Sequence, residues 1–179
     1  MGQKLVAFYS RRGENYVDGR IQTLEVGNTE IAAGMVRLLT QADLFQIEPA
    51  REYSPNYFTC IDQARQDLCR GVRLKLKRWP NRFTEYDTVC LGYPNHWNTL
   101  PVAVISFVAG LDFSGKTILP FCVHEGDGMG RSEADLRRLC PGARILPGLP
   151  IRSADVKYSM DTLENWLNDT TQKTEEELI

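Results

Sequence analysis

The sequence predicts an α/β protein in which one parallel sheet is covered by helices on both faces. Its 179 residues suit a single domain. Short apolar runs alternate along the chain with segments whose apolar residues recur at helical spacing. The runs are apolar at nearly every position, which is typical of strands buried on both faces of a parallel sheet. We expect right-handed crossovers between successive strands.

The first half of the chain contains two strands and two helices in this pattern. They are expected, in the order strand, helix, strand, helix, at residues 4–10, 28–39, 42–50 and 56–70. Asn28 and Thr29 offer side-chain oxygens for the N-cap of the first helix. Pro49 ends the second strand, because proline cannot donate to a ladder.

The second half continues the alternation with three strands and three helices. They are expected at residues 88–94, 101–110, 117–123, 133–139, 143–151 and 161–168, beginning with a strand. Ser132 is the expected cap of the helix over 133–139. Residues 1–170 therefore form the predicted domain, and residues 171–179 form a polar C-terminal tail.

The junction between the first strand and the first helix is unusually long. About seventeen residues, 11–27, separate them, whereas such junctions usually have about 2–6 residues. This segment is therefore an insertion, and its part GRIQTLEVG, residues 19–27, could form a small hairpin.

Charge and composition exclude several functions. The net charge is −2 with mixed signs, which gives no electrostatic case for nucleic acid. No apolar stretch approaches the ~20 residues of a membrane span. The five cysteines form no CxxC, and with only two histidines there is no zinc spacing. We expect buried, reduced cysteines and a cytoplasmic protein without metal, membrane or nucleic-acid partner.

The loops after the first, third and fourth strands are where a ligand should bind in such a sheet. The first loop ends GNTE at residues 27–30, and this helix start can hold an anion together with the hydroxyl of Ser10. The third loop, Tyr93–Pro101, contains Trp97, whose flat face suits an aromatic ring. The fourth loop, Val123–Ser132, has glycines that permit close backbone approach.

Each of these signals also has a simpler interpretation. Asn-Thr before a helix is more often only a cap. Trp97 could pack against a neighbouring helix, and the glycines of the fourth loop could mark mere flexibility. The coincidence of all three signals on the three loops that the fold selects favours a ligand site.

The motifs on these loops show a resemblance to a known family. The chain contains SRRGENY followed by GNTE, then LGYPNHWNTLP, DFSGKTILPFCVHEGDGMG and LCPGA. In these motifs it resembles the flavodoxin-like proteins, over residues 4 to about 167. The resemblance implies a three-layer flavodoxin-like sandwich with a five-stranded parallel sheet in the order 2-1-3-4-5. It also accounts for the insertion, and it implies FMN as cofactor.

The resemblance implies a set of FMN-binding residues on the same three loops. They are Ser10, Arg11, Asn28 and Thr29 at the phosphate; Pro94, His96, Trp97, Asn98 and Thr99 beside the isoalloxazine; and His124, Gly126 and Gly128 on the ring's other edge.

The chain departs from the family pattern at three places. Arg12 stands where the family usually has Thr, and residues 95–98 read NHWN where an apolar residue, Trp, Trp and Gly are usual. Glu125 and Asp127 stand where small residues are common, which puts carboxylates near a ring that becomes anionic on full reduction.

The expected function is that of an FMN-binding redox protein, either an electron carrier or a small flavin-dependent reductase. Its partner would be a redox protein or a small-molecule electron acceptor. No residue is required as acid or base, and His96 and His124 are candidates only because they border the ring and titrate near neutrality. The alternative is a flavodoxin-fold binding module that has lost or weakened FMN binding. A phosphoryl-accepting receiver domain is disfavoured, because it needs an acceptor aspartate at the end of a central strand. The first strand ends Tyr9-Ser10 and the third ends Gly92-Tyr93-Pro94.

Overall fold

The computed structural model describes residues 2–176, with side chains up to residue 170, and it confirms the predicted fold class. All ladders of the main sheet are parallel, in the order β4-β1-β5-β6-β7, with β8 also paired to β6. This is the expected 2-1-3-4-5 order. The strands of this sheet are β1 Gln3–Phe8, β4 Asp43–Gln46, β5 Tyr86–Pro94, β6 Thr117–His124, β7 Arg144–Ile145 and β8 Leu149–Arg152.

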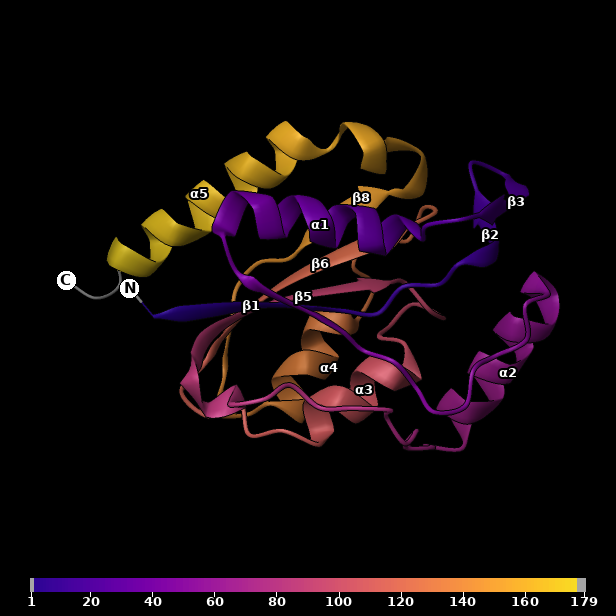
Figure 1. Cartoon of the computed structure of the whole chain (residues 1–179), viewed down its shortest axis with the longest axis horizontal. Helices are drawn as coiled ribbons and strands as arrows, with labels where there is room; N and C mark the ends of the chain where they lie inside the picture. The colour runs from indigo at the N-terminus through magenta and orange to yellow at the C-terminus, as the bar shows by residue number, and fades with distance from the viewer. Residues whose placement is uncertain (1, 177–179) are drawn as a thin grey trace.

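Helices cover both faces of this sheet, as Figure 1 shows. Helices α1 and α5 lie on one face, and α3 and α4 lie on the other. The bounds are α1 Asn28–Thr40, α2 Tyr57–Cys69, α3 Val102–Ala109, α4 Ser132–Leu139 and α5 Met160–Glu176, with 3₁₀ turns at Phe83–Glu85 and Ser153–Tyr158. Within residues 2–176, no helix is long and apolar enough to cross a membrane.

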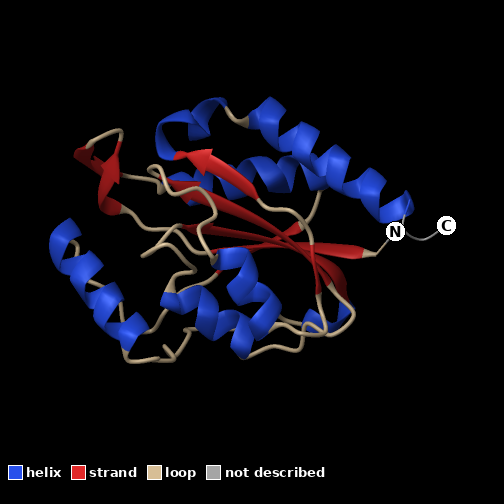
Figure 2. Ribbon diagram, turned by 180° about the vertical axis from the view of Figure 1, so that it is seen from behind, coloured by secondary structure: helices blue, strands red, loops and turns tan. Residues whose placement is uncertain are grey.

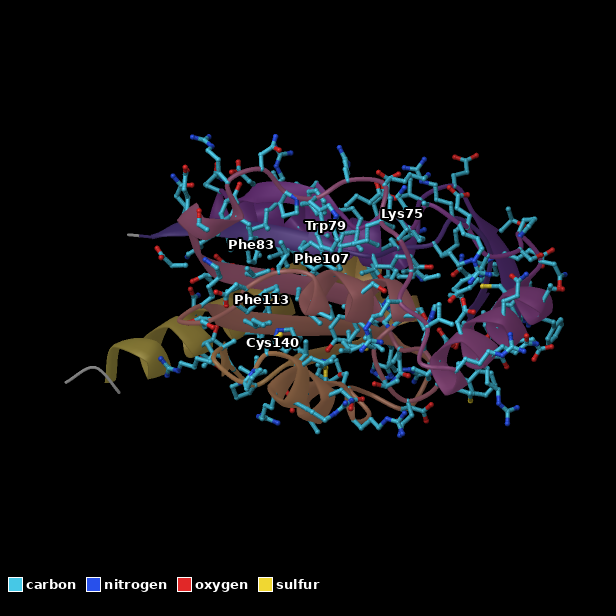
Figure 3. All side chains as sticks on the ribbon, turned by 90° about the horizontal axis from the view of Figure 1, so that it is seen from below. Lys75, Trp79, Phe83, Phe107, Phe113 and Cys140 are labelled. Carbon is cyan, nitrogen blue, oxygen red and sulfur yellow. The ribbon has the colours of Figure 1, made fainter. Side chains whose placement is uncertain are left out.

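The core on the α3 side is rich in aromatic rings. Phe107 of α3 stacks on Phe45 of β4 with ring centroids 5.8 Å apart, and Trp79 stacks on Phe107 at 6.1 Å. Phe83 and Phe113 close the cluster, 4.9 Å from each other. Figure 3 looks onto this face, where the labelled side chains of Trp79, Phe83, Phe107 and Phe113 lie near one another. The chain after α2 thus covers part of the sheet without forming a helix.

The predicted fifth strand is divided into the two short strands β7 and β8. Pro147 and Gly148 lie between them. Proline has no N–H to donate, and glycine weakens a strand, so the ladder with β6 is interrupted here. Both pieces still pair with β6, through Ile145 opposite Ile118 and Ile151 opposite Val123.

The insertion after β1 forms an antiparallel hairpin beyond the carboxyl edge of the sheet. Its strands are β2 Gly13–Val17 and β3 Arg20–Leu24, so the segment expected to form the hairpin supplies only its turn and second strand. Helix α2 lies beside the hairpin instead of over the sheet, at the left of Figure 2. Glu14 fastens the two, because its carboxylate accepts the N–H of Tyr57 at 2.8 Å.

Two expected caps are replaced by other contacts. Asn28 and Thr29 are already helical, and neither side chain caps α1; Ser10 Oγ accepts the N–H of Glu30 at 3.1 Å instead. The end of β1 lies against the start of α1, so its hydroxyl takes the position of a cap. Ser132 is the first residue of α4, and its hydroxyl donates to the carbonyl of Met129 at 2.6 Å.

The closing helix is longer than expected. Helix α5 begins at Met160 and continues through Glu176, so residues 171–176 of the expected tail are helical. The segment contains neither proline nor glycine to end the helix. Residues 177–179 of that tail lie outside the described residues.

Candidate functional site

A cavity of about 300 Å³ opens at the carboxyl edge of β1, β5 and β6, between the hairpin and α2. Its position is the one that parallel α/β sheets use for ligands. It is lined by Ser10, Arg11, Asn15, Tyr16, Asn28, Thr29, Tyr57, Cys60, Ile61, Ala64, Pro94, Asn95, His96, Trp97, Val123, His124, Glu125, Asp127 and Ser153.

The start of α1 forms what we call the helix wall, made of Ser10, Asn28 and Thr29. Gly27 lies so close to the end of β1 that an added Cβ would be 2.2 Å from Ser10 Oγ and 2.5 Å from the Arg11 carbonyl oxygen. A glycine at this position therefore lets the first turn of α1 reach the cavity. Ser10 Oγ accepts from Glu30 N–H, which leaves its own hydrogen free to donate.

Asn28 and Thr29 carry unused hydrogen-bonding groups. Neither their backbone N–H groups nor their side chains have a hydrogen-bond partner within residues 2–176, although Thr29 is buried. The first N–H groups of a helix have no partner inside the helix and carry partial positive charge. The helix wall is therefore equipped to bind an anion.

Arg11 brings a positive charge to the cavity but is held in place by backbone carbonyls. Its Nη1 donates to Glu14 at 3.1 Å, and its Nη2 donates to Ser54 at 2.9 Å and to Pro55 at 3.2 Å. These contacts join the hairpin to the segment before α2. Arg12, by contrast, is exposed and forms an ion pair with Glu30 at 2.9 Å.

The loop after β5 turns back on itself through a type I′ turn. Trp97 and Asn98 have φ of +52° and +64°, and His96 and Thr99 exchange two backbone hydrogen bonds of 3.1 Å. Asparagine tolerates this left-handed conformation better than most residues. The turn is fixed from outside as well, because Asn98 N–H donates to Asn95 Oδ1 at 2.9 Å and its carbonyl accepts from Arg131 N–H at 2.9 Å.

Trp97 packs against α2 while lining the cavity. Its Nε1–H donates to the carbonyl of Ile61 at 2.9 Å, and the Arg65 guanidinium lies over its ring at 5.1 Å. The alternative that Trp97 packs on a helix is therefore correct, but it does not remove the residue from the cavity. Its ring helps to form an aromatic wall, which we define as Tyr16, Tyr57 and Trp97.

Tyr16 and Tyr57 complete the aromatic wall from the two elements beyond the sheet. Their rings stack with centroids 5.9 Å apart. Tyr16 comes from β2, and Tyr57 is the first residue of α2. The insertion is thus part of the site.

His96 has a buried nitrogen without a partner. Its Nδ1 makes no hydrogen bond within the described part of the chain. Burial, together with the nearby positive charge of Arg11, lowers the pKa of His96 to about 4. The imidazole is therefore neutral at pH 7, and it can hydrogen-bond a ligand without carrying charge.

The loop after β6 is shaped by local hydrogen bonds. Gly126 N–H donates to His124 Nδ1 at 3.0 Å, and the Gly128 carbonyl accepts from Asn95 Nδ2 at 3.0 Å. Gly128 has φ of +59°, a conformation that favours glycine. Through Asn95 this loop is joined to the turn after β5.

Glu125 of the same loop contacts the hairpin turn. Its Oε2 accepts the N–H of Asp18 at 2.9 Å, whereas its Oε1 is buried and has no partner within the described residues. Burial raises the pKa of the Glu125 carboxyl, and the N–H groups of Asp18 and Gly19 oppose this rise.

A family model described as flavodoxin matches residues 24–170, which is most of the chain. The chain belongs to the flavodoxin family. No curated protein matches this flavodoxin.

Solved structures support the same fold. A protein of Bacteroides uniformis, provisionally named a flavoprotein, is 24% identical with a TM-score of 0.74, over 93% of this chain and 98% of the other. A similarly named protein of Bacteroides eggerthii is 23% identical with a TM-score of 0.67, over 91% and 98%. A flavoprotein of Lactobacillus acidophilus, in complex with FMN, is 10% identical with a TM-score of 0.66, over 88% and 98%.

The predicted site residues divide into two groups in this flavodoxin. Those that line the cavity are Ser10, Arg11, Asn28, Thr29, Pro94, His96, Trp97 and His124. Asn98, Thr99, Gly126 and Gly128 belong to the same two loops but do not line the cavity. Thr99, for example, is buried, and its hydroxyl donates to Asp135.

The residues that sequence reasoning missed come mainly from the hairpin and α2. They include Asn15, Tyr16, Tyr57, Cys60, Ile61 and Ala64. Their signal was the GENY segment of the insertion, which belongs to the motif that carried the resemblance. The position of α2 at the mouth of the cavity had no local signal.

The residues present fit an FMN. The helix wall offers free donors for a phosphate, and the aromatic wall offers flat apolar faces for a ring. Two buried atoms of the site, His96 Nδ1 and Glu125 Oε1, also lack the hydrogen bonds that a ligand can supply. FMN, the cofactor expected from the motifs, agrees with the family whose model matches the chain. Among the side chains that the structure describes, which end at residue 170, there is no cluster of His, Cys, Asp and Glu that could hold a metal ion.

Proposed function

We propose that this flavodoxin binds FMN in the cavity and is a small flavin-dependent reductase. The observation that carries the proposal is one cavity lined both by an anion-binding helix start and by an aromatic wall. The FMN held by its structural relative from Lactobacillus supports the same occupant.

The helix wall would hold the phosphate. The N–H groups of Asn28 and Thr29 and the hydroxyls of Ser10 and Thr29 are free to donate, and the start of α1 favours a negative charge. Arg11 adds a fixed positive charge nearby, and its hydrogen bonds go to backbone carbonyls, so no carboxylate neutralises this charge through them. The site contains no second glycine-rich phosphate loop, so one terminal phosphate matches it better than a pyrophosphate.

The aromatic wall would orient the isoalloxazine, which supplies the redox chemistry when bound. Tyr16 and Tyr57 are stacked on each other, and Trp97 is fixed by its bond to Ile61. These rings would exclude water from the flavin and quench its fluorescence. Neutral His96 offers its unpartnered Nδ1 without adding charge.

The fixed turn after β5 favours the reductase over the one-electron carrier. A one-electron carrier would rotate the peptide before Asn98 when the redox state of the flavin changes. That rotation would break the hydrogen bond from Asn98 N–H to Asn95 Oδ1. The bond from Arg131 N–H to the Asn98 carbonyl opposes the same movement. A turn held in this way serves two-electron transfer, in which the protein keeps one arrangement.

Titration of the flavin-free protein with FMN, riboflavin and FAD tests the proposal. Flavin fluorescence should be quenched on binding, with FMN bound more tightly than riboflavin, because a hydrogen bond to a charged phosphate contributes about 1.5–3 kcal/mol. Riboflavin binding as tightly as FMN would contradict the phosphate assignment. Failure of all three flavins to bind would favour the binding-module alternative.

A further inference from the structure

The carboxyl group of Glu125 uses its two oxygens in different ways. Oε2 accepts the N–H of Asp18, which holds the hairpin turn over the loop after β6. Oε1 is buried at the cavity and has no hydrogen-bond partner within residues 2–176. The N–H of Gly19 in the same turn also favours the ionised carboxyl group, but Oε2 accepts the one hydrogen bond that this carboxylate makes within the described residues.

An unpartnered, buried carboxylate oxygen is unfavourable, and ligand binding at this site can relieve it in two ways. A ligand in the cavity can donate a hydrogen bond to Oε1, or the oxygen can take up a proton. A negative charge on a ligand beside Oε1 makes protonation of the carboxylate more favourable. A ligand that gains a proton donor makes the hydrogen bond to Oε1 more favourable.

Charged and titratable groups surround Glu125 from the hairpin, from α2, from β8 and from its own loop. Asp18 of the hairpin disfavours its ionised form, whereas Arg152 of β8 favours it. Tyr57 of α2 is close enough to interact with the Glu125 charge, and Asp127 lies on the same loop at the cavity. Burial outweighs these effects and raises the pKa of Glu125. A further negative charge beside the carboxyl group would raise the pKa again.

We propose that Glu125 takes up a proton when a flavin bound in this cavity is reduced, an inference that rests on the proposed function. Reduction of a bound flavin by a chemical reductant such as dithionite would add two electrons and, with one proton from solvent, would leave one additional negative charge in the cavity. A second solvent proton binds the carboxylate of Glu125. The sum is two electrons and two protons, and the net charge of the cavity does not change.

The uptake also affects the hairpin. A protonated carboxyl group can keep accepting from Asp18 N–H through one oxygen while its O–H is free to donate to a ligand in the cavity. The contact between hairpin and β6 loop is therefore retained in both redox states. Glu125→Gln preserves this geometry, because the amide oxygen accepts from Asp18 and the amide N–H₂ replaces the donor, but the amide cannot take up a proton.

The midpoint potential of bound FMN, measured from about pH 6 to about pH 8, tests the inference. Each proton taken up with two electrons changes the potential by about 30 mV per tenfold change in proton concentration. The unmodified protein should therefore show a slope of about 60 mV per pH unit, and Glu125→Gln a slope of about 30 mV. Asp127→Asn removes the same charge from the same loop, and it should shift the potential while the steeper slope is retained.

An infrared difference spectrum provides a second readout. Reduction should produce a protonated-carboxyl band in the unmodified protein and in Asp127→Asn, and this band should be absent in Glu125→Gln. Equal slopes in the unmodified protein and Glu125→Gln would place the second proton elsewhere and overturn the inference. The FMN dissociation constant is measured first, because lack of binding by the unmodified protein overturns the proposed function, whereas binding with equal slopes overturns only the role of Glu125.

Discussion

The two walls of the cavity are built on different principles. The helix wall consists of backbone N–H groups and short side chains at the junction of β1 and α1. The aromatic wall consists of large side chains from the hairpin, α2 and the turn after β5. The groups that titrate, His96 and Glu125, come from the loops after β5 and β6 and not from the helix wall.

This difference separates what the fold provides from what this chain adds. Any parallel α/β sheet places a helix start beside the end of its first strand, so an anion site there follows from general geometry. The aromatic wall depends on the insertion and on Glu14 and Arg11, which hold α2 beside it. We expect changes in the helix wall to affect phosphate recognition, and changes in the aromatic wall to affect the ring.

The largest expected effect is that of Gly27→Ala. The added Cβ would clash with Ser10 Oγ and with the Arg11 backbone, so the start of α1 must move away from β1. The free energy of unfolding should fall by about 1–3 kcal/mol. FMN affinity should fall by about a hundredfold, equivalent to about 3 kcal/mol. Calorimetry and chemical denaturation measure both quantities.

Gly34→Ala is the matched control on the same helix. Nothing lies within 4 Å of its added Cβ, so this variant should be more stable by about 0.5–1 kcal/mol with unchanged FMN affinity. Equal behaviour of the two variants would show that the close approach at Gly27 has no role in the site.

Thr29→Val should separate ligand binding from capping. Thr29 makes no cap contact, so the variant should unfold with nearly the parent's free energy, while FMN binding weakens by about 1.5–3 kcal/mol. Ser10→Ala should instead lower stability by about 0.5–2 kcal/mol, because Glu30 N–H loses its acceptor. A Thr29→Val protein that binds FMN like the parent would remove Thr29 from the phosphate site.

His96 should make the protein less stable in acid. Its pKa is about 4 in the folded state against an ordinary value of 6.5, so the unfolded chain binds the proton more readily. Stability is thus full above about pH 6.5 and falls as the pH drops towards about 4. The loss should be about 1–3 kcal/mol.

The variant His96→Asn isolates this contribution. Denaturation at several pH values should show a smaller acid loss in the variant than in the parent. Parallel pH profiles for the two proteins would mean that His96 titrates normally in the folded chain.

Tyr16→Leu should have the smallest effect and act on the ring alone. Loss of the Tyr16–Tyr57 stack should cost about 0.5–1.5 kcal/mol of flavin binding. Riboflavin should lose as much affinity as FMN, and the bound flavin should become more fluorescent. A loss confined to FMN would assign Tyr16 to the phosphate instead.

The same contrast explains how much could be predicted from the sequence. Most element bounds followed from buried strands and helical spacing, and the site's position followed from the strand ends. The sheet order followed from the resemblance to the flavodoxin-like proteins. The cap at Ser10 was missed, because it joins residues of different elements. The position of α2 was missed because Glu14 and Arg11 hold it through contacts distant in sequence, which periodicity does not encode.

The fifth strand and the turn after β5 show a subtler limit. One strand was expected over residues 143–151, and the weight of Pro147 within it was missed; β7 and β8 both still pair with β6. Asn98 was assigned to the ring by its place in the motif, whereas its backbone is committed to Asn95 and Arg131. A motif fixes the loop, but the contacts between loops decide which side chains face the cavity.

The central claim is that one FMN spans both walls. Its most direct test is the ratio of FMN affinity to riboflavin affinity, measured in the parent, in Thr29→Val and in Tyr16→Leu. The account predicts a ratio well above one in the parent, a ratio at least about tenfold lower in Thr29→Val with riboflavin affinity unchanged, and the parent's ratio in Tyr16→Leu with both affinities lowered. A ratio of one in the parent, or a ratio that neither variant changes selectively, would contradict it.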